Sequence, residues 1–258
     1  MQQDKKDAPI KATQATRLVP SGTNGIALVE VLRSEDRFDL AWDRYLRINA
    51  VAEEVKRIVR ADNLKDKKIL DVGGFDGALA LFFVDEPDFE VEVIDPCTTG
   101  ASGNEIGKGA RSYSIVVAID ALEHVRPECR SAFLAEASRV ARDYCILNFP
   151  SHGTMEAQRL VLSLTGDQFI REHVEYVLPN HEQVVAEMEG HGFSCKVIHH
   201  GDSMVWVSQF VLRHVAPEAA KATARFQVER LHKQVGSPSE PLYDMIVCKR
   251  VHEHENIL

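Results

Sequence analysis

The sequence predicts an α/β protein built on a doubly wound, mostly parallel sheet. Three observations predict it. An apolar strand passes through a glycine turn into a helix at residues 67–83, a second strand ends in an acid at 91–96, and strand, helix and strand follow one another from 114 to 152. Ligands of such sheets bind beyond the carboxyl ends of the strands. The residues that follow each strand are therefore the first candidates for a functional site.

Composition limits the classes of protein to consider. The 258 residues are enough for one sizeable α/β domain with an insertion, and the net charge of −9 argues against a nucleic-acid groove. No apolar run approaches the roughly 20 residues of a membrane span, and residues 1–25 lack the apolar centre of a signal peptide. The five cysteines form no C-x-x-C pair, so we expect reduced core thiols and a cytoplasmic protein that does not contact membranes.

The segment KKILDVGGFDGALALFF organises the prediction. Residues 69–72 form the strand, Gly73, Gly74 and Gly77 form the turn, and a helix is expected over 78–84. Glycine suits such a turn because a side chain would keep a ligand from the backbone, and because other residues resist the required backbone angles. The spacing does not match the G-x-G-x-x-G fingerprint of dinucleotide-binding proteins.

Two acids, Asp71 and Asp76, flank this turn. They would repel a pyrophosphate, and they favour a ligand that carries positive groups. S-adenosylmethionine, with its sulfonium and its ammonium, is such a ligand. An ordinary strand–turn–helix without a ligand would show the same local pattern.

The motif DVGGFDG resembles the first motif of the class I S-adenosylmethionine-dependent methyltransferases, acid-x-Gly-x-Gly-x-Gly. Gly73 and Gly77 match it, and Phe75 replaces its middle glycine, which puts close backbone approach at that position in doubt. The resemblance covers about residues 40–200. It implies a Rossmann-like fold and S-adenosyl-L-methionine as cofactor, bound by Asp71, Gly73, Gly74, Phe75 and Gly77.

The N-terminal part divides into a polar segment and a helix. Residues 1–24 are punctuated by proline and glycine and predict a flexible leader, which leaves one domain over 25–258. Apolar residues recur at helical spacing from 39 to 60. Methyltransferases of this class often place such a helix over the cofactor, which would bring Tyr45 and Arg47 to the site. Tyr45 in the core and Arg47 in solvent is an equal alternative.

The second strand, VEVIDP, ends at Asp95 and Pro96. Asp95 follows Gly77 by 18 residues, close to the spacing expected for an acid that accepts hydrogen bonds from both ribose hydroxyls. We expect Asp95 and Pro96 to contact the cofactor, although a strand-ending acid can also form a turn. Residues 97–113 are short and rich in glycine, and they predict a compressed crossover with a vestigial strand at Asn104–Ile106.

The segment SIVVAIDALEHV contains a buried strand over 115–119, and Asp120, Glu123 and His124 crowd its carboxyl end. It is similar to the fourth-strand motif of the same methyltransferases, in which an acid is common at the position of Ser114. The resemblance implies that Asp120 also contacts the cofactor.

The rest of the chain alternates helices and strands. FPSH, EHVEYVLPN and HGF resemble a subset of small bacterial-type methyltransferases that are often assumed to act on sugars or other small metabolites. We expect a helix from Pro127 to Ala141, a fifth strand over 144–152, a helical insertion over 153–180, a helix over 181–189, a sixth strand from HGFSCKVI, a helical region over 203–235 and a closing strand over 241–250.

Histidines supply the candidates for a general base, because their pKa lies near neutral pH. His124 and His152 are the first candidates, and His173 in the insertion is the third. Each could instead be structural: a strand cap, part of a proline turn or a solvated helix residue. These histidines with Glu172 match no standard spacing of metal ligands, so we predict no metal site.

These features predict a methyltransferase that acts on a small-molecule acceptor, with a hydroxyl oxygen as the methylated atom. The absence of an Asn-Pro-Pro-Tyr-like segment after the fourth strand argues against nucleic-acid or protein amide acceptors. Three alternatives remain open: a non-catalytic cofactor-binding module of the same fold, a methyltransferase of proteins or nucleic acids, and a dinucleotide oxidoreductase. The sequence leaves the oligomeric state undetermined.

Overall fold

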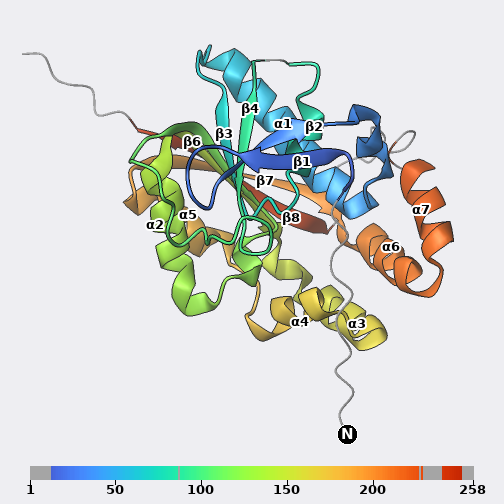
Figure 1. Cartoon of the computed structure of the whole chain (residues 1–258). Helices are drawn as coiled ribbons and strands as arrows, with labels where there is room; N and C mark the ends of the chain where they lie inside the picture. Colours follow the sequence, from blue (N-terminus) through green and yellow to red (C-terminus); the bar gives the residue numbers. More distant parts are fainter. Residues whose placement is uncertain (1–12, 87, 227, 229–239, 252–258) are drawn as a thin grey trace, which may run out of the picture.

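The computed structural model describes residues 13–86, 88–226, 228 and 240–251. Eight strands form one sheet in the order β1-β2-β4-β3-β5-β6-β8-β7 (Figure 1). The strands are β1 (Thr16–Pro20), β2 (Ala27–Val31), β3 (Lys68–Val72), β4 (Glu90–Ile94), β5 (Tyr113–Ile119), β6 (Ala141–Pro150), β7 (Phe193–Asp202) and β8 (Pro241–Arg250). The α-helices are α1 (Trp42–Ala61), α2 (Arg130–Val140), α3 (Met155–Thr165), α4 (Gln168–Glu175), α5 (His181–Gly190), α6 (Ser203–Val215) and α7 (Pro217–Phe226). Short 3-10 helices are η1 (Ser34–Asp39), η2 (Ala78–Phe82), η3 (Leu122–His124), η4 (Pro127–Cys129) and η5 (His152–Thr154).

The centre of the sheet is parallel and its two edges are antiparallel. β4, β3, β5 and β6 pair in parallel, whereas β2 runs against β4 and β8 runs against both β6 and β7. The predicted α/β sheet is present, and the closing strand forms as expected over 241–250, but the expectation of a mostly parallel sheet is wrong because only the central strands pair in parallel. The sheet is mixed because both of its edges reverse direction.

Helices cover both faces of the central strands. All seven residues of β5 are buried, and its apolar residues from Ile115 to Ile119 alternate between two apolar clusters. Ile115 and Val117 pack in a cluster with α1, and Val116 and Ala118 pack in a cluster with α2 and α5. Burial on both faces explains why this strand reads as a continuous apolar run.

The predicted leader is wrong for residues 16–20, which form β1. Thr16 and Val19 are β-branched residues that suit a strand, and Arg17 donates two hydrogen bonds to Glu30 on the paired strand β2. The Thr16 hydroxyl also donates to the carbonyl of Asp76, at 2.6 Å. Residues 1–12 of the leader lie outside the described residues, as do residues 227 and 229–235 of the predicted helical region.

The vestigial strand expected at Asn104–Ile106 does not form. The backbone groups of Ile106 bond to side chains of α2 instead: its N–H donates to Glu136, and its carbonyl accepts from Arg139. The hairpin of β1 and β2 lies at the edge of the sheet beside β4. The N-terminal hairpin therefore extends the sheet beyond β4, and the short crossover between β4 and β5 adds no strand.

The helix predicted over 78–84 is shorter than expected. Gly77 begins it with a left-handed backbone, φ 76°, and the turn is a 3-10 helix that closes at Phe83 with a bond to the carbonyl of Ala80. All five of its residues are buried, in contact with α1 and with the hairpin. In the second half of the chain, α3 and α4 follow β6, and α6 and α7 follow β7 (Figure 1). Among the described residues, no helix combines the length and the apolar character that crossing a bilayer requires.

Candidate functional site at the carboxyl edge of the sheet

The four central strands bring the predicted site residues to one edge of the sheet. Their carboxyl ends meet there because the strands are parallel. The residue that follows β3 and the residue that follows β5 each bond to a neighbouring strand: the N–H of Gly73 donates to the carbonyl of Ile94 at 2.8 Å, and the N–H of Asp120 donates to the carbonyl of Asn148 at 2.8 Å. The predicted cofactor residues therefore lie at the ends of neighbouring strands along one edge of the sheet.

The glycine turn is tightly packed against its surroundings. Gly73, Phe75 and Gly77 all have left-handed backbones, with φ values of 80°, 49° and 76°. A Cβ atom on Gly73 would lie 2.6 Å from the Cβ of Ala121, and one on Gly74 would lie 2.4 Å from a carboxylate oxygen of Asp71. Larger residues at these two positions would therefore displace the acid or the adjoining turn.

Asp71 is buried without a partner for one of its oxygens. Its side chain lies directly against Gly74, and Oδ1 has no hydrogen-bond partner. Burial, with the nearby charges of Asp76 and Asp95, raises the pKa of Asp71 to about 7. A cationic group placed at this turn would supply the missing partner.

Asp76 has a structural role. Its carboxylate pairs with Arg44 of α1 at 2.5 Å, and it accepts hydrogen bonds from the backbone N–H groups of Thr13 at 2.7 Å and of Ala78 at 3.2 Å. The charge of Asp76 is therefore compensated within the protein. Of the two acids that flank the turn in sequence, only Asp71 remains available for a ligand.

Asp95 caps the turn after β4. Oδ1 accepts from the N–H groups of Cys97 at 2.8 Å and Thr98 at 3.1 Å, and Oδ2 accepts from the N–H of Phe75 at 3.2 Å. Asp95 therefore forms the turn that the sequence left open as an alternative. A carboxylate offers about four lone-pair sites, so Oδ2 keeps capacity for a ligand hydroxyl. Pro96 is exposed beside it.

Asp120 lies between β5 and α1. It has a left-handed backbone, φ 50°, and Arg47 donates to its Oδ2 at 2.8 Å, whereas Oδ1 is buried without a partner. Burial raises the pKa of Asp120 to about 6, although Arg47 acts in the opposite direction. Arg47 also pairs with Asp43 at 3.4 Å. Arg47 is therefore at the site and not in solvent, and Tyr45 is in the core.

A cluster of ionisable groups lies at the carboxyl end of β5. His124 Nδ1 is 2.7 Å from Glu172 Oε2, and its Nε2 is 3.4 Å from the Nε2 of His173. His173 Nδ1 is 3.1 Å from Gln158 Oε1. Glu123 is fully buried, and neither of its carboxylate oxygens has a partner. We call Glu123, His124, His173, Glu172 and Gln158 the η3–α4 cluster.

The pKa values of the ionisable groups in this cluster are shifted from their usual ranges. Burial, with the nearby Asp120, raises the pKa of Glu123 to about 8. Burial alone would lower the pKa of His124, but Glu172 and Glu123 outweigh it and raise the pKa. The pKa of His173 falls well below its usual range because it is buried beside His124. The two facing imidazoles therefore differ in basicity, and His124 is the more basic of the two.

His152 lies apart from the η3–α4 cluster. It is exposed at the start of η5, and its Nδ1 is 3.1 Å from the carbonyl of Leu178. This contact joins the turn after β6 to the segment before α5. The geometry matches the turn role that the sequence left open for this residue.

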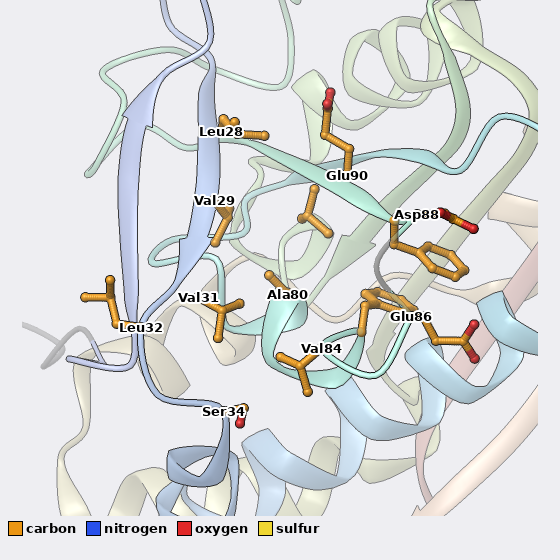
Figure 2. Close-up of a pocket in the computed structure, with 13 residues that line it drawn as sticks. Leu28, Val29, Val31, Leu32, Ser34, Ala80, Val84, Glu86, Asp88 and Glu90 are labelled. Carbon is orange, nitrogen blue, oxygen red and sulfur yellow. The ribbon is translucent and has the colours of Figure 1, made fainter.

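A separate groove of about 620 Å³ lies on the N-terminal side of the sheet. Figure 2 shows Val31 on β2 facing Ala80 and Val84, with Glu86, Asp88 and Glu90 along the other side. Glu90 is the first residue of β4, so this groove lies at the opposite end of that strand from Asp95. None of the predicted site residues lines the groove.

The sequence did not predict the roles of three side chains at this edge. Arg44 was missed, although it lies one turn before Arg47 on α1 and this spacing indicates a shared face. Gln158 carries no local signal, because it meets His173 only through the packing of α3 on α4. Glu123 was noted near the strand end without a role, and burial is the property that distinguishes it.

Comparisons with known proteins bear on the fold. No protein-family model and no curated protein matches the sequence. Among solved structures, the plantazolicin methyltransferase BpumL in complex with a pentazolic desmethylPZN analog and SAH is similar at 10% identity, over 84% of this chain and 88% of that one, with a TM-score of 0.53. The chain has the fold of the class I S-adenosylmethionine-dependent methyltransferases. The methyltransferase fold agrees with the predicted Rossmann-like class.

Two further solved structures are similar at lower TM-scores. The magnesium protoporphyrin IX methyltransferase (ChlM) from Synechocystis PCC 6803, with bound SAH, is 12% identical over 86% of this chain and 89% of that one, with a TM-score of 0.47. A SAM-dependent methyltransferase from Archaeoglobus fulgidus is 15% identical over 77% of this chain and 94% of that one, also at 0.47.

Proposed function

We propose that this chain is an S-adenosyl-L-methionine-dependent methyltransferase that acts on a small-molecule acceptor, with a hydroxyl oxygen as the methylated atom. The observation that carries the proposal is the buried, partnerless oxygen of Asp71 at the glycine turn of a methyltransferase fold. A buried carboxylate without a partner is costly, and a cationic ligand would offset that cost.

The residues present at this edge fit the cofactor. Asp71, with the backbone of Gly73, Gly74, Phe75 and Gly77, would hold its charged amino-acid part. The turn at Gly74 leaves no room for a side chain beside the acid. Asp95 and Pro96 would hold the ribose, since Oδ2 of Asp95 keeps an acceptor site. Asp120 lies at the next strand end and completes the edge.

The cofactor supplies an activated methyl group on a sulfonium. The chain then has to position the acceptor oxygen in line with that methyl and to remove the hydroxyl proton. His124 is the first candidate for the proton acceptor, because Glu172 orients its ring at the carboxyl end of β5. His152 remains the second candidate, at the end of β6.

Calorimetric titration tests the cofactor assignment. We expect saturable heats with S-adenosylmethionine and with S-adenosylhomocysteine, and none with NAD at the same concentrations. Binding of NAD alone would replace this proposal with a dinucleotide oxidoreductase. Cofactor binding without transfer to any acceptor would instead favour a non-catalytic module.

Transfer of a labelled methyl group to a panel of acceptors tests the chemistry. The panel pairs each hydroxyl compound with its O-methylated analogue, and it includes a protein and an RNA. We expect label on the hydroxyl compounds only. Label on the macromolecules alone would show that the acceptor class is wrong.

A further inference from the structure

Three potential metal ligands converge at the η3–α4 cluster. Ligand atoms of Glu123, His124 and His173 all lie within 4.8 Å of one another. Glu123 and His124 belong to η3, which follows β5, and His173 belongs to α4 in the insertion after β6. Residues distant in sequence are thus held together by the packing of α4 on η3.

The second nitrogen of each imidazole is already occupied. Glu172 Oε2 lies 2.7 Å from Nδ1 of His124, and Gln158 Oε1 lies 3.1 Å from Nδ1 of His173. Each acceptor holds a proton on Nδ1 and leaves a lone pair on Nε2 of a neutral ring. Histidines that bind metals show this arrangement, with the non-coordinating N–H donated to a carboxylate or a carbonyl.

The distance between the two Nε2 atoms fits a metal better than a hydrogen bond. They lie 3.4 Å apart, which is long for a hydrogen bond between nitrogens, since N–H donors lie about 2.7–3.2 Å from their acceptors. Two nitrogens bound tetrahedrally to zinc, each at about 2.0–2.1 Å, lie about 3.3–3.4 Å apart. Two facing lone pairs repel each other, and either a proton or a metal ion between them removes that repulsion.

Glu123 indicates a cation at this cluster independently of the two histidines. Its side chain is fully buried, and neither oxygen has a hydrogen-bond partner. A buried carboxylate is normally paired or coordinates a metal, and the neighbouring charge of Asp120 makes an unpaired carboxylate costlier still. A cation beside His124 and His173 would give Glu123 its missing partner.

We propose that Glu123, His124 and His173 bind a divalent transition-metal ion of the zinc type, with Glu172 and Gln158 orienting the two imidazoles. Two imidazoles and one carboxylate form a ligand set that zinc accepts, and three protein ligands leave a position open. The spacing in sequence predicted no metal site, because His173 lies 49 residues after His124.

The open position lies close to the proposed cofactor site. Ala121, two residues before Glu123, packs against the glycine turn. A Cβ atom added to Gly73 would lie 2.6 Å from the Cβ of Ala121. If the proposed function is correct, a bound ion would offer this position to the acceptor oxygen and would lower the pKa of its hydroxyl, and the released proton would pass to solvent water. His124 then holds the ion and does not itself accept that proton. The metal site itself does not depend on the proposed function.

The test uses the full chain, stripped of metal with a chelator and titrated with Zn²⁺ alone by calorimetry. We expect saturable binding to one site, and Co²⁺ in place of Zn²⁺ should give the intense visible absorption of a tetrahedral ion. Glu123→Gln and His173→Gln should each weaken Zn²⁺ binding by about 100-fold or more, and Glu172→Gln by about 10-fold. His199→Gln is the matched control, because His199 also pairs with a buried carboxylate, that of Asp244, away from this cluster.

Circular dichroism of the metal-free variants shows whether each is folded. If His173→Gln fails to fold, the partly exposed His124 and Glu172 provide the variants to compare. Zinc affinity that stays at the wild-type value in the folded cluster variants, or a wild-type chain without saturable binding, would overturn the proposal. A chain that binds the cofactor but not zinc contradicts only this inference, and the reverse contradicts only the proposed function.

Discussion

Asp71 is the single side chain on which cofactor affinity should depend most. The pKa of about 7 means that the carboxyl is largely neutral at pH 6 and ionised at pH 8. A bound cation favours the ionised form, so the affinity for S-adenosylmethionine should rise with pH, by up to about tenfold per unit below pH 7. Calorimetry from pH 5.5 to 8 measures this dependence.

The variant Asp71→Asn separates this effect from the titration of the cofactor itself. We expect weaker binding at pH 8 and a flatter pH dependence than in the wild type. Asp88→Asn is the control, because Asp88 is exposed beside the groove. Equal pH profiles for the wild type and Asp71→Asn would show that this carboxylate does not meet the cofactor.

The same residue should also affect the stability of the ligand-free protein. Its folded pKa is raised from 3.8 to about 7, so the folded state binds the proton more tightly than the unfolded chain does. Ionising Asp71 therefore lowers the free energy of unfolding. This loss is absent below about pH 4, grows as the pH rises and is complete above about pH 7. At pH 8, Asp71→Asn should therefore raise the free energy of unfolding by on the order of 2 kcal/mol. Urea denaturation at pH 4 and at pH 8 tests this, and a gain that is equal at both values would contradict it.

The two candidate bases should differ in their effect on turnover. His124 belongs to the η3–α4 cluster, whereas His152 bonds to the Leu178 carbonyl. His124→Gln should lower kcat by about 100- to 10,000-fold, whether its ring accepts the hydroxyl proton or holds a metal ion, and His152→Gln should lower it by less than about tenfold. Single-turnover transfer at saturating cofactor measures both values. A larger loss of kcat in His152→Gln than in His124→Gln would indicate that His152, at the end of β6, is the proton acceptor.

At the scale of elements, the hairpin of β1 and β2 is attached to the glycine turn through Asp76. Arg44 is mostly buried and pairs with this acid, so Arg44→Met leaves a buried carboxylate without its cation. We expect a loss of about 3 kcal/mol in the free energy of unfolding, partly recovered in the double variant with Asp76→Asn. Arg17→Met is the control, because the Arg17–Glu30 pair is exposed and should contribute less than about 1 kcal/mol. Equal losses in the two single variants would contradict this account of Asp76.

The elements that the sequence predicted well carry their own local signal. The strand at residues 115–119 and the helix beginning near Trp42 have clear apolar periodicity, and both form. The elements it mistook depend on distant partners. Residues 16–20 become a strand by pairing with β2 and contacting Asp76, and Ile106 stays irregular because α2 satisfies its backbone groups.

At the scale of the molecule, the carboxyl edge was predictable because parallel strands align their ends. That is why the glycine turn, Asp95 and Asp120 were expected together, and they lie on one edge. The side-chain contacts across it were not predictable: Arg44 meets Asp76, which is 32 residues away in sequence, and His173 meets His124, which is 49 residues away. The packing of α1 and α4 determines which side chains meet, and no local sequence pattern indicates that packing.

The central claim is that this edge holds a cationic cofactor beside Asp71. A crystal structure of the chain grown with S-adenosylhomocysteine, which keeps the ammonium of the methyl donor, tests it most directly. The account predicts the ligand against residues 73–77, with its ammonium at Asp71 and its ribose at Asp95. Crystals in which this edge is empty, or in which the ligand occupies the groove lined by β2 and Val84, would contradict it.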